Sequence, residues 1–260
     1  PLPLVLRRQR QMCIRDRVRS LLGWDQEVLM PPKAAELRGE QIAWISRESH
    51  KRKTSPRVGE LLDELEERVD LGDIESANVR LAREAYDKAT RLPTGFVSEL
   101  AKHNSKSLIS WTEARRNNDF SMFRDDLSKS IEFARKKADY LGYEDLRYDA
   151  LLDNYESGLT VSRLDPLFEG LRNKVAPLIR SVAERGERPD ISWVTENSWE
   201  QVGQERLSQK VSESIGFDFE AGRRDASTHP FCGGPNPDDV RWTTRSVSYT
   251  HLTLPTKNEV

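Results

Sequence analysis

The sequence has no excess of basic residues, almost no cysteine and no long apolar run, and each of these absences excludes a class of protein. Lysine and arginine number 41 against 43 acidic residues in a chain of 260, so the formal net charge is −2. Without a positive field the chain is poorly suited to hold the polyanionic backbone of a nucleic acid. No stretch approaches the ~18–20 consecutive apolar residues that a membrane-spanning helix needs. We therefore expect neither a nucleic-acid partner nor a membrane.

The cysteines and histidines give no sign of a disulfide framework or a metal site. Cys13 and Cys232 lie too far apart for a CxxC pair and are too few for a framework, which favours a cytoplasmic protein. The HExxH helix, the P-loop, the GxGxxG fingerprint and the GxSxG elbow are all missing. His50 and His103 lie in polar helical sequence, which predicts solvated surface residues rather than metal ligands.

The two ends of the chain differ in composition from its interior. The first residues are rich in arginine, and their apolar and charged residues follow the wrong order for a secretory signal. Residues 1–17 and 246–260 resemble translated sequencing-adapter read-through. We expect both segments to be non-native, and we exclude Cys13 and His251 from the functional argument.

Between these ends the dominant hydrophobic period is 3.6, which predicts amphipathic helices. Apolar stripes run along residues 58–69, 74–89, 96–111, 120–141, 164–182 and 207–215. Gly142 and Gly216 follow two of these stripes, and glycine is favoured in the left-handed position after a helix. Asp165 is expected to cap a helix that starts at Pro166 and is kinked by Pro177, and Ser198 with Gln201 has capping-box spacing.

After Gly216 the helical period gives way to short extended stretches. Residues 225–231 contain Pro230, and beyond them Val240, Trp242 and Thr244 alternate with polar residues. Such alternation is typical of a strand, so two short strands paired as a hairpin are expected. The predicted fold class is mainly α, a multi-helix domain over residues 18–245 with a small β-hairpin near the C-terminus. No composition shift divides this interior.

Polar residues gather in the extended region. Asp239, Arg241 and Thr243 share one face of the predicted strand because side chains alternate across a strand. A guanidinium held by a neighbouring acid is well placed to bind a carboxylate through two hydrogen bonds. Equally, Asp239 and Arg241 can form a structural ion pair, and His229 before Pro230 can be a hydrogen-bond donor in a turn. Residue types alone leave both interpretations open.

Several motifs, in the same order along the chain, resemble the N-terminal half of the carboxypeptidase Taq family of zinc metallocarboxypeptidases, over residues 18–245. The matching segments are residues 21–26 with 30–31, 148–153 with 155–156, 216–219, 229–231 and 239–243. The His-Pro-Phe segment that ends at Phe231 and the Asp-x-Arg-x-Thr segment that ends at Thr243 correspond to the first two signature motifs of the family, beside its active-site groove. One departure is Arg224, where the family usually has an apolar residue.

The resemblance implies an elongated, grooved helical metallopeptidase that releases C-terminal amino acids from peptides. It implies zinc or another divalent metal as cofactor, peptide substrates, and a homodimer when full length. By this resemblance the candidate substrate-binding residues are His229, Phe231, Asp239, Arg241 and Thr243. The HExxH motif that follows in the family is missing from this sequence. We therefore expect the zinc-binding half to be absent, and these 260 residues to bind no zinc and to be inactive alone.

Other interpretations remain open beside this one. A noncatalytic helical scaffold or binding module would account for the missing zinc ligands without a missing half. An oligopeptide endopeptidase with a similar helical groove is less favoured, because the two signature motifs belong to the carboxypeptidase. We expect Trp24 to be buried at a helix start with Asp25 and Gln26 as caps. We expect the acids Asp149 and Asp153 to cap helix ends rather than serve as general acid and base.

Overall fold

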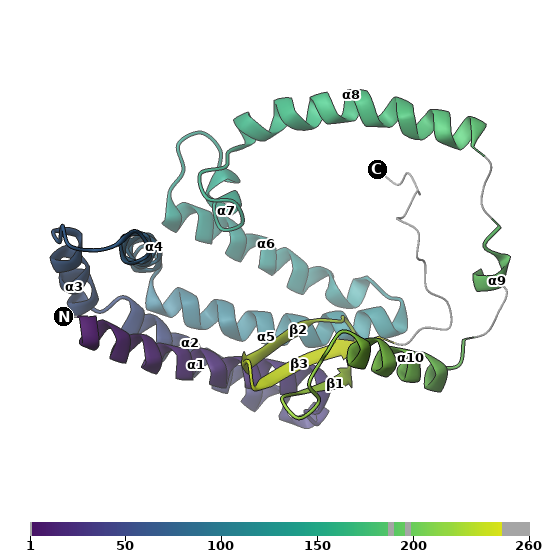
Figure 1. Ribbon diagram of the computed structural model, residues 1–260, viewed down its shortest axis with the longest axis horizontal. Helices are drawn as coiled ribbons and strands as arrows, with labels where there is room; N and C mark the ends of the chain where they lie inside the picture. Colours follow the sequence, from purple (N-terminus) through teal and green to yellow (C-terminus); the bar gives the residue numbers. More distant parts are fainter. Residues whose placement is uncertain (1, 187–189, 196–198, 246–260) are drawn as a thin grey trace. The chain divides into compact units, whose positions relative to one another are not determined.

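The protein is mainly helical, with a small sheet near its C-terminus (Figure 1). The structure, a computed structural model, describes residues 2–186, 190–195 and 199–245, with side chains from residue 14 on except at 194 and 195. The longer helices are α1 (Leu2–Val28), α2 (Ala35–Lys53), α3 (Pro56–Glu66), α4 (Asp73–Thr90), α5 (Thr94–Asn117), α6 (Ser121–Leu141), α8 (Val161–Arg185) and α10 (Gln201–Ser214). Shorter turns are η1 (Pro32–Ala34), α7 (Asp149–Leu152) and α9 (Ser192–Thr195). The predicted fold class is confirmed.

The chain divides into two compact units, Pro1–Leu167 and Phe168–Val260. The boundary falls inside α8, where the sequence gives no composition shift. At the N-terminus, α1 continues through residue 17 without a break. Residues 246–260 and Ser198, the predicted capping residue, lie outside the described residues.

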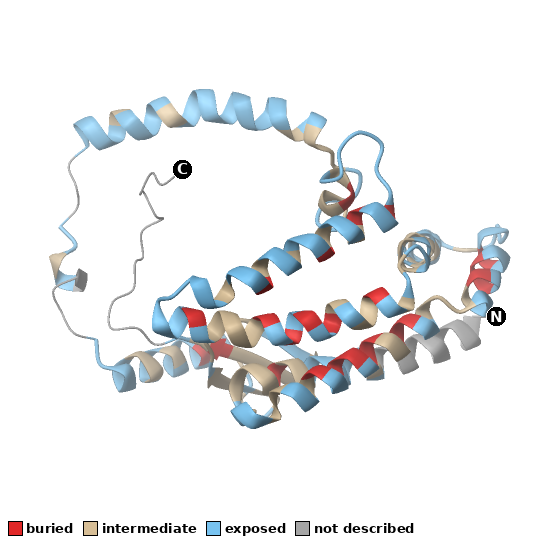
Figure 2. Ribbon diagram, turned by 180° about the vertical axis from the view of Figure 1, so that it is seen from behind, coloured by how far each residue is buried: buried red, intermediate tan, exposed pale blue. Residues whose placement is uncertain are grey.

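The core of the first unit lies between long helices. Helix α2 packs along α5, α5 along α6, and α1 along α2, and Figure 2 shows buried residues along the faces of α2 and α5. The ring of Phe96 lies 5.8 Å from that of Phe133 and 5.1 Å from that of Tyr140, centre to centre. Tilted aromatic pairs of this kind stabilise by about 0.5–1.5 kcal/mol beyond the area they bury. Helix α6 ends at Leu141 as predicted, with Gly142 at a φ of 79°.

Small polar residues fill much of the space between α2 and α5. The buried serines of these two helices are Ser46, Ser49, Ser105 and Ser107, and Ser107 lies 3.5 Å from Ser130 of α6. His50 and His103 are also buried, with 8% and 7% of their surface exposed, so the prediction that they are solvated was wrong. His50 explains the error, because its ring nitrogens lie 3.1 Å from Thr94 Oγ1 and 3.0 Å from the Ala89 carbonyl. Polar helical sequence thus forms a close helix contact here, in which the ring of His50 is hydrogen-bonded while the hydroxyls of Ser46 and Ser49 are buried without a partner among the described residues.

Helix α8 forms as its apolar period predicts, but its apolar side chains are not buried. The exposed ones include Leu167, Phe168, Leu171, Leu178, Ile179 and Val182. The helix begins at Val161, before Pro166, so the prediction of an Asp165 cap was wrong. The carboxylate of Asp149 accepts the hydrogen bond of Val161 N instead, at 2.8 Å. None of the helices in the described part of the chain has the length and apolar run that a membrane crossing requires.

The second unit contains a three-stranded sheet with the order β1–β3–β2. Strand β1 (Gly222–Ala226) pairs in parallel with β3 (Asp239–Thr244), and β2 (Cys232–Asn236) pairs antiparallel with β3. The expected hairpin exists, but its first strand is Cys232–Asn236 instead of residues 225–231, which mostly form the connection. The glycines and proline of β2 have low strand propensity, which concealed this strand in the sequence.

Candidate functional site

Strand β3 separates a charged face of the sheet from an aromatic one. Side chains alternate across a strand, so Asp239, Arg241 and Thr243 share one face. On the other face the rings of Phe217 and Trp242 meet edge to face, with centres 6.0 Å apart. The segment of residues 216–219 therefore packs on the aromatic face, and the predicted site residues of β3 lie together on the charged face.

The hydroxyl of Thr243 holds the turn at residues 227–231 against β3. Thr243 is 4% exposed, and its Oγ1 accepts a hydrogen bond from Phe231 N at 2.9 Å. Oγ1 also lies 2.6 Å from Ser227 Oγ, which donates to the carbonyl of His229 at 2.8 Å. With the Ser227 proton directed at His229, the Thr243 hydroxyl donates to Ser227, and every group in the chain of hydrogen bonds has a partner. Thr243 thus fixes the position of the His-Pro-Phe segment.

Arg241 is held by the acid that precedes it on the same face. Its Nε donates to Asp239 Oδ1, and the two side chains are 19% and 32% exposed. An arginine that is already fixed loses less side-chain entropy when it binds a carboxylate. The ion pair that both interpretations of the sequence require is therefore present.

His229 lies at the surface of the turn. Its Nδ1 is 3.0 Å from the carbonyl of Pro230, so the ring is oriented by its own backbone. The hydrogen bond that the turn interpretation of His229 requires is therefore present. Phe231, two residues on, is partly buried, and its carbonyl accepts the backbone hydrogen bond of Thr243 N at 2.8 Å. All five predicted site residues thus come together on one strand and one turn.

Two residues that sequence reasoning missed share the charged face. The parallel register places Arg223 opposite Arg241 and Asp225 opposite Thr243. Arg223 donates from Nε and Nη2 to the carboxylate of Asp225, at 2.9 and 2.5 Å. The signal in the sequence is Arg-x-Asp, which has the same spacing as Asp-x-Arg. It is informative only once β1 is known to pair with β3.

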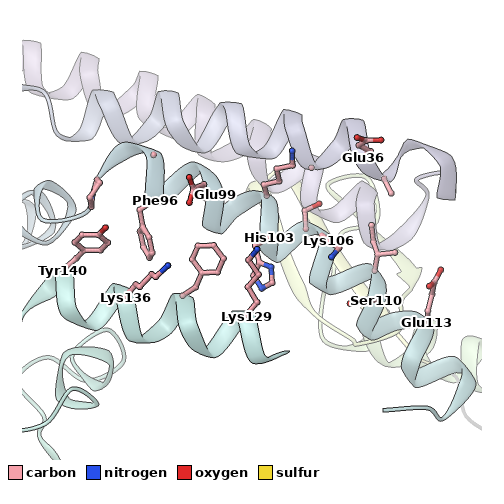
Figure 3. Close-up of a pocket in the computed structure, with 18 residues that line it drawn as sticks. Glu36, Phe96, Glu99, His103, Lys106, Ser110, Glu113, Lys129, Lys136 and Tyr140 are labelled. Carbon is pink, nitrogen blue, oxygen red and sulfur yellow. The ribbon is translucent and has the colours of Figure 1, made fainter. Parts of the chain in front are cut away.

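A separate cavity of about 990 Å³ lies in the first unit, between α2, α5 and α6 (Figure 3). Its aromatic lining is Phe96, Phe133 and Tyr140, and its charged lining is Glu36, Glu99, Glu113, Lys102, Lys106, Lys129 and Lys136. On α6 the lysines and aromatic rings recur at spacings of three and four residues, so one face of that helix lines the cavity.

His103 is the titratable group of this cavity that burial affects most clearly. Its ring stacks on Phe133 with centres 5.1 Å apart, and its Nε2 lies 2.9 Å from Ser130 Oγ. Burial lowers the pKa of His103 because a charged imidazole is poorly solvated there. The nearby ammonium groups of Lys129 and Lys106 lower the pKa of His103 further, while Asp126 opposes them.

Comparison with known proteins places the chain in a family. The sequence model described as carboxypeptidase Taq (M32) metallopeptidase matches residues 5–254. The chain belongs to this family. It is 37% identical over 227 residues to carboxypeptidase 1 of Bacillus subtilis, a match that covers 87% of this chain and 45% of the relative. It is 35% identical to thermostable carboxypeptidase 1 of Thermus thermophilus, over 91% of this chain and 49% of that protein.

Solved structures of M32 carboxypeptidases agree with this assignment. A crystal structure of BsuCP superposes with a TM-score of 0.86 at 35% identity, over 92% of this chain and 48% of that one. The Pyrococcus furiosus carboxypeptidase structure gives a TM-score of 0.80 at 32% identity, over 95% and 50%. The chain therefore spans about half the length of the M32 relatives it matches.

The family is one of metallopeptidases, so the residues present can be tested for a metal centre. Metal sites of this kind need several histidine, cysteine or carboxylate ligands within reach of one point. Within residues 2–186, 190–195 and 199–245, no three such side chains are grouped in a way that could hold a metal ion. The described part of the chain does not fit the family's metal.

The remaining motifs of the M32 resemblance have structural roles. Trp24 is 7% exposed, as predicted, but it lies near the end of α1 instead of at a helix start. Asp25 pairs with Arg38 of α2 at 2.6 Å, and Gln26 exchanges two hydrogen bonds with Ser105 of α5. These side chains join helices and are not caps, so that part of the prediction was wrong.

The two acids expected to cap helix ends, Asp149 and Asp153, both form hydrogen bonds with backbone N–H groups. Asp149 accepts from Leu146 N and from Val161 N, which ties α7 to the start of α8. Asp153 accepts from Gly158 N and pairs with Lys88 at 2.6 Å, and these contacts lower the pKa of Asp153. A carboxylate held ionised by a salt bridge is a poor general acid, so the structural interpretation agrees with the geometry.

Proposed function

We propose that these 260 residues are the first half of a metal-dependent carboxypeptidase that releases C-terminal amino acids from peptides, and that its zinc-binding half is absent from this chain. The observation that carries the proposal is the charged face of β3, where the family's first two motifs form one hydrogen-bonded unit around Thr243. Membership of the M32 family and coverage of about half of its members support it.

The exposed apolar stripe of α8 also supports this proposal. Soluble monomers rarely present large contiguous apolar patches, and such patches mark surfaces that bind another protein segment. Residues such as Phe168 and Leu178 are more than half exposed. A second half of the enzyme would cover this stripe. The same stripe would also suit the alternative, a noncatalytic binding module, so the test must measure catalysis.

In the proposed enzyme, Arg241 orients the carboxylate end of the peptide and Asp239 fixes its guanidinium. His229 and Phe231 shape the groove near the bond that is cleaved, and Thr243 holds them there. The described residues do not form a metal site, so zinc or another divalent metal would be held by ligands from the absent half, and it would supply a Lewis acid for the last peptide carbonyl. We further propose that the complete enzyme is a cytoplasmic homodimer.

A fusion tests the proposal. The chain is joined to the second half of carboxypeptidase 1 of Bacillus subtilis, loaded with zinc, and assayed for release of the C-terminal residue from a short peptide. We expect release, and we expect Arg241→Ala to lower kcat/KM about tenfold to hundredfold, as for loss of a hydrogen bond between charged groups. Arg224→Ala, on the opposite face, is the matched control and should change little. A folded, zinc-loaded fusion that releases no C-terminal residue would refute the proposal.

A further inference from the structure

The cavity between α2, α5 and α6 belongs to the first unit, and the proposed function does not use it. All its lining residues lie between Ala35 and Tyr140, and none of the candidate substrate-binding residues is among them. Its volume of about 990 Å³ lies at the upper end of the range for ligand pockets, about 300–1,000 Å³. Such pockets combine an apolar lining with a few polar groups that orient the ligand. This cavity has both features.

A row of rings forms the apolar part of the lining. Phe96 contacts both Tyr140 and Phe133, with ring centres 5.1 and 5.8 Å away. Phe133 also stacks on His103, with centres 5.1 Å apart. The rings of Phe96, Phe133 and His103 belong to residues that are 7–8% exposed, so packing holds them in place. A fixed row of this kind favours a ligand with an aromatic ring, because aromatic pairs add to the stabilisation that burial gives.

Two lysines of α6 provide positive charge to the lining. Lys129 and Lys136 lie four residues before and three residues after Phe133, which places them on the same face of the helix as its ring. Figure 3 shows both on the α6 side of the cavity. The lysines of α5, Lys102 and Lys106, are each paired with an acid. Lys129 and Lys136 form no ion pair with any acid that the structure describes, so an anionic ligand would compensate their charge.

The positive charge and the rings meet beside His103. Burial lowers the pKa of His103 most, and the nearby ammonium group of Lys129 lowers it further. Asp126 raises that pKa, but its carboxylate already accepts a hydrogen bond from Lys106 at 3.1 Å. A ligand carboxylate at this end of the row of rings would therefore meet an ammonium group that no described acid neutralises.

Three glutamates limit the charge of the ligand. Glu36, Glu99 and Glu113 also line the cavity. Their negative charges oppose a ligand with several anionic groups, such as a nucleotide. A single carboxylate compensates the α6 lysines with the least repulsion from these acids. The lining therefore fits a small molecule with one carboxylate and one aromatic ring.

We propose that this cavity binds a small aromatic carboxylic acid, whose ring packs beside Phe96 and Phe133 while Lys129 and Lys136 hold its carboxylate. The inference is independent of the proposed function, because no residue of the charged face of β3 takes part in it. It assigns to the chain a second binding site, for a small molecule. The competing occupant is a segment of the absent half, and the experiment tests for it.

The experiment measures the binding of 3-phenylpropionate and of its amide to the 260-residue chain by NMR titration. The amide keeps the ring and loses the charge, so the ratio of the two affinities reports the contact between carboxylate and lysine. The ring protons of His103, which lines the cavity, locate the bound probe, and those of His50, which does not, serve as the reference. Circular dichroism of each variant checks that the fold is retained.

We expect the chain to prefer the acid, and we expect the acid to shift the signals of His103 but not those of His50. Lys129→Met and Lys136→Met should each lower the preference about threefold, since methionine keeps an apolar stem but loses the charge. Lys137→Met is the matched control, because Lys137 follows Lys136 on the same helix but lies outside the lining. Glu99→Gln should raise the preference, an effect of opposite sign that a loss of structure would not produce.

The outcomes decide the proposal. Equal affinities for acid and amide, unmoved His103 signals, or lysine variants that behave like Lys137→Met would each refute it. The zinc-loaded fusion with the second half of the Bacillus subtilis enzyme is titrated in the same way, and a loss of binding there would show that the second half fills the cavity. Binding to both proteins, weakened by Lys129→Met and Lys136→Met, supports the inference. None of these results bears on the release of C-terminal residues, which is assayed separately.

Discussion

Replacement of Thr243 by valine should release the His-Pro-Phe turn while the sheet stays in place. Valine keeps the shape of threonine but removes the acceptor of the Phe231 N–H and the partner of the Ser227 hydroxyl. A buried donor that loses its partner costs about 1–3 kcal/mol. Since a factor of ten corresponds to about 1.4 kcal/mol, the turn should open about five to 150 times more often. If water enters the turn and accepts the Phe231 N–H, the increase in opening should lie at the lower end of this range.

Amide hydrogen exchange at Phe231 measures this opening directly. Thr244→Val is the matched control, because it makes the same substitution one residue further on, on the aromatic face of the sheet. We expect Phe231 to exchange at least five times faster in Thr243→Val, and at nearly the wild-type rate in Thr244→Val. Equal exchange rates at Phe231 in the two variants would show that the Thr243 hydroxyl does not hold the turn.

Three further changes test other parts of the structure. Gly234→Ala should destabilise the β2–β3 hairpin by about 1–3 kcal/mol, because φ is 152° there and a Cβ would lie 2.9 Å from Val240 Cα. Gly233→Ala is the control, because a Cβ there meets open space. Thermal unfolding of the second unit compares the two variants, and equal losses of stability would contradict the argument. Burial lowers the pKa of His103, so the unfolded chain takes up a proton more readily and the free energy of unfolding should fall as pH drops below about 6.5. His103→Gln should remove that part of the slope in urea titrations, and an unchanged slope would exclude His103 as its source. Gln26→Ala breaks two hydrogen bonds to Ser105, and it should lower the free energy of unfolding in urea by about 1–2 kcal/mol. Identical urea midpoints for the wild type and the variant would contradict this.

The local elements of the fold could be predicted because their signals are local. Helix α3 shows this, since Leu61, Leu62 and Leu65 recur at helical spacing and are 2–4% exposed. Helix α6 likewise ends where Gly142 permits a positive φ. The same period at α8 predicted the helix but not its exposure, because a hydrophobic stripe does not reveal what packs against it.

The features that the sequence did not reveal depend on distant pairing. Strand β2 consists largely of glycine and proline and gains its regular structure from β3. The burial of His50 and His103 depends on which helices approach them, and a polar neighbourhood in sequence does not exclude the burial of a histidine whose ring nitrogens find hydrogen-bond partners. Asp239, Arg241 and Thr243 were correctly predicted to share one face of a strand, because residues two apart on a strand point to the same side of the sheet.

The aromatic face of the sheet determines which residues of β1 lie on the charged face. A slip of β1 by one residue would turn Arg223 and Asp225 away from Arg241 and towards the aromatic side. Gly222 opposes this slip, because a Cβ at that position would lie 2.5 Å from the ring of Phe217, and any other β1 residue moved there would collide with the ring. The contact between a glycine and a phenylalanine on one face thus fixes Arg223 and Asp225 on the other. A larger residue at 222 should therefore change the charged face without touching a charged group.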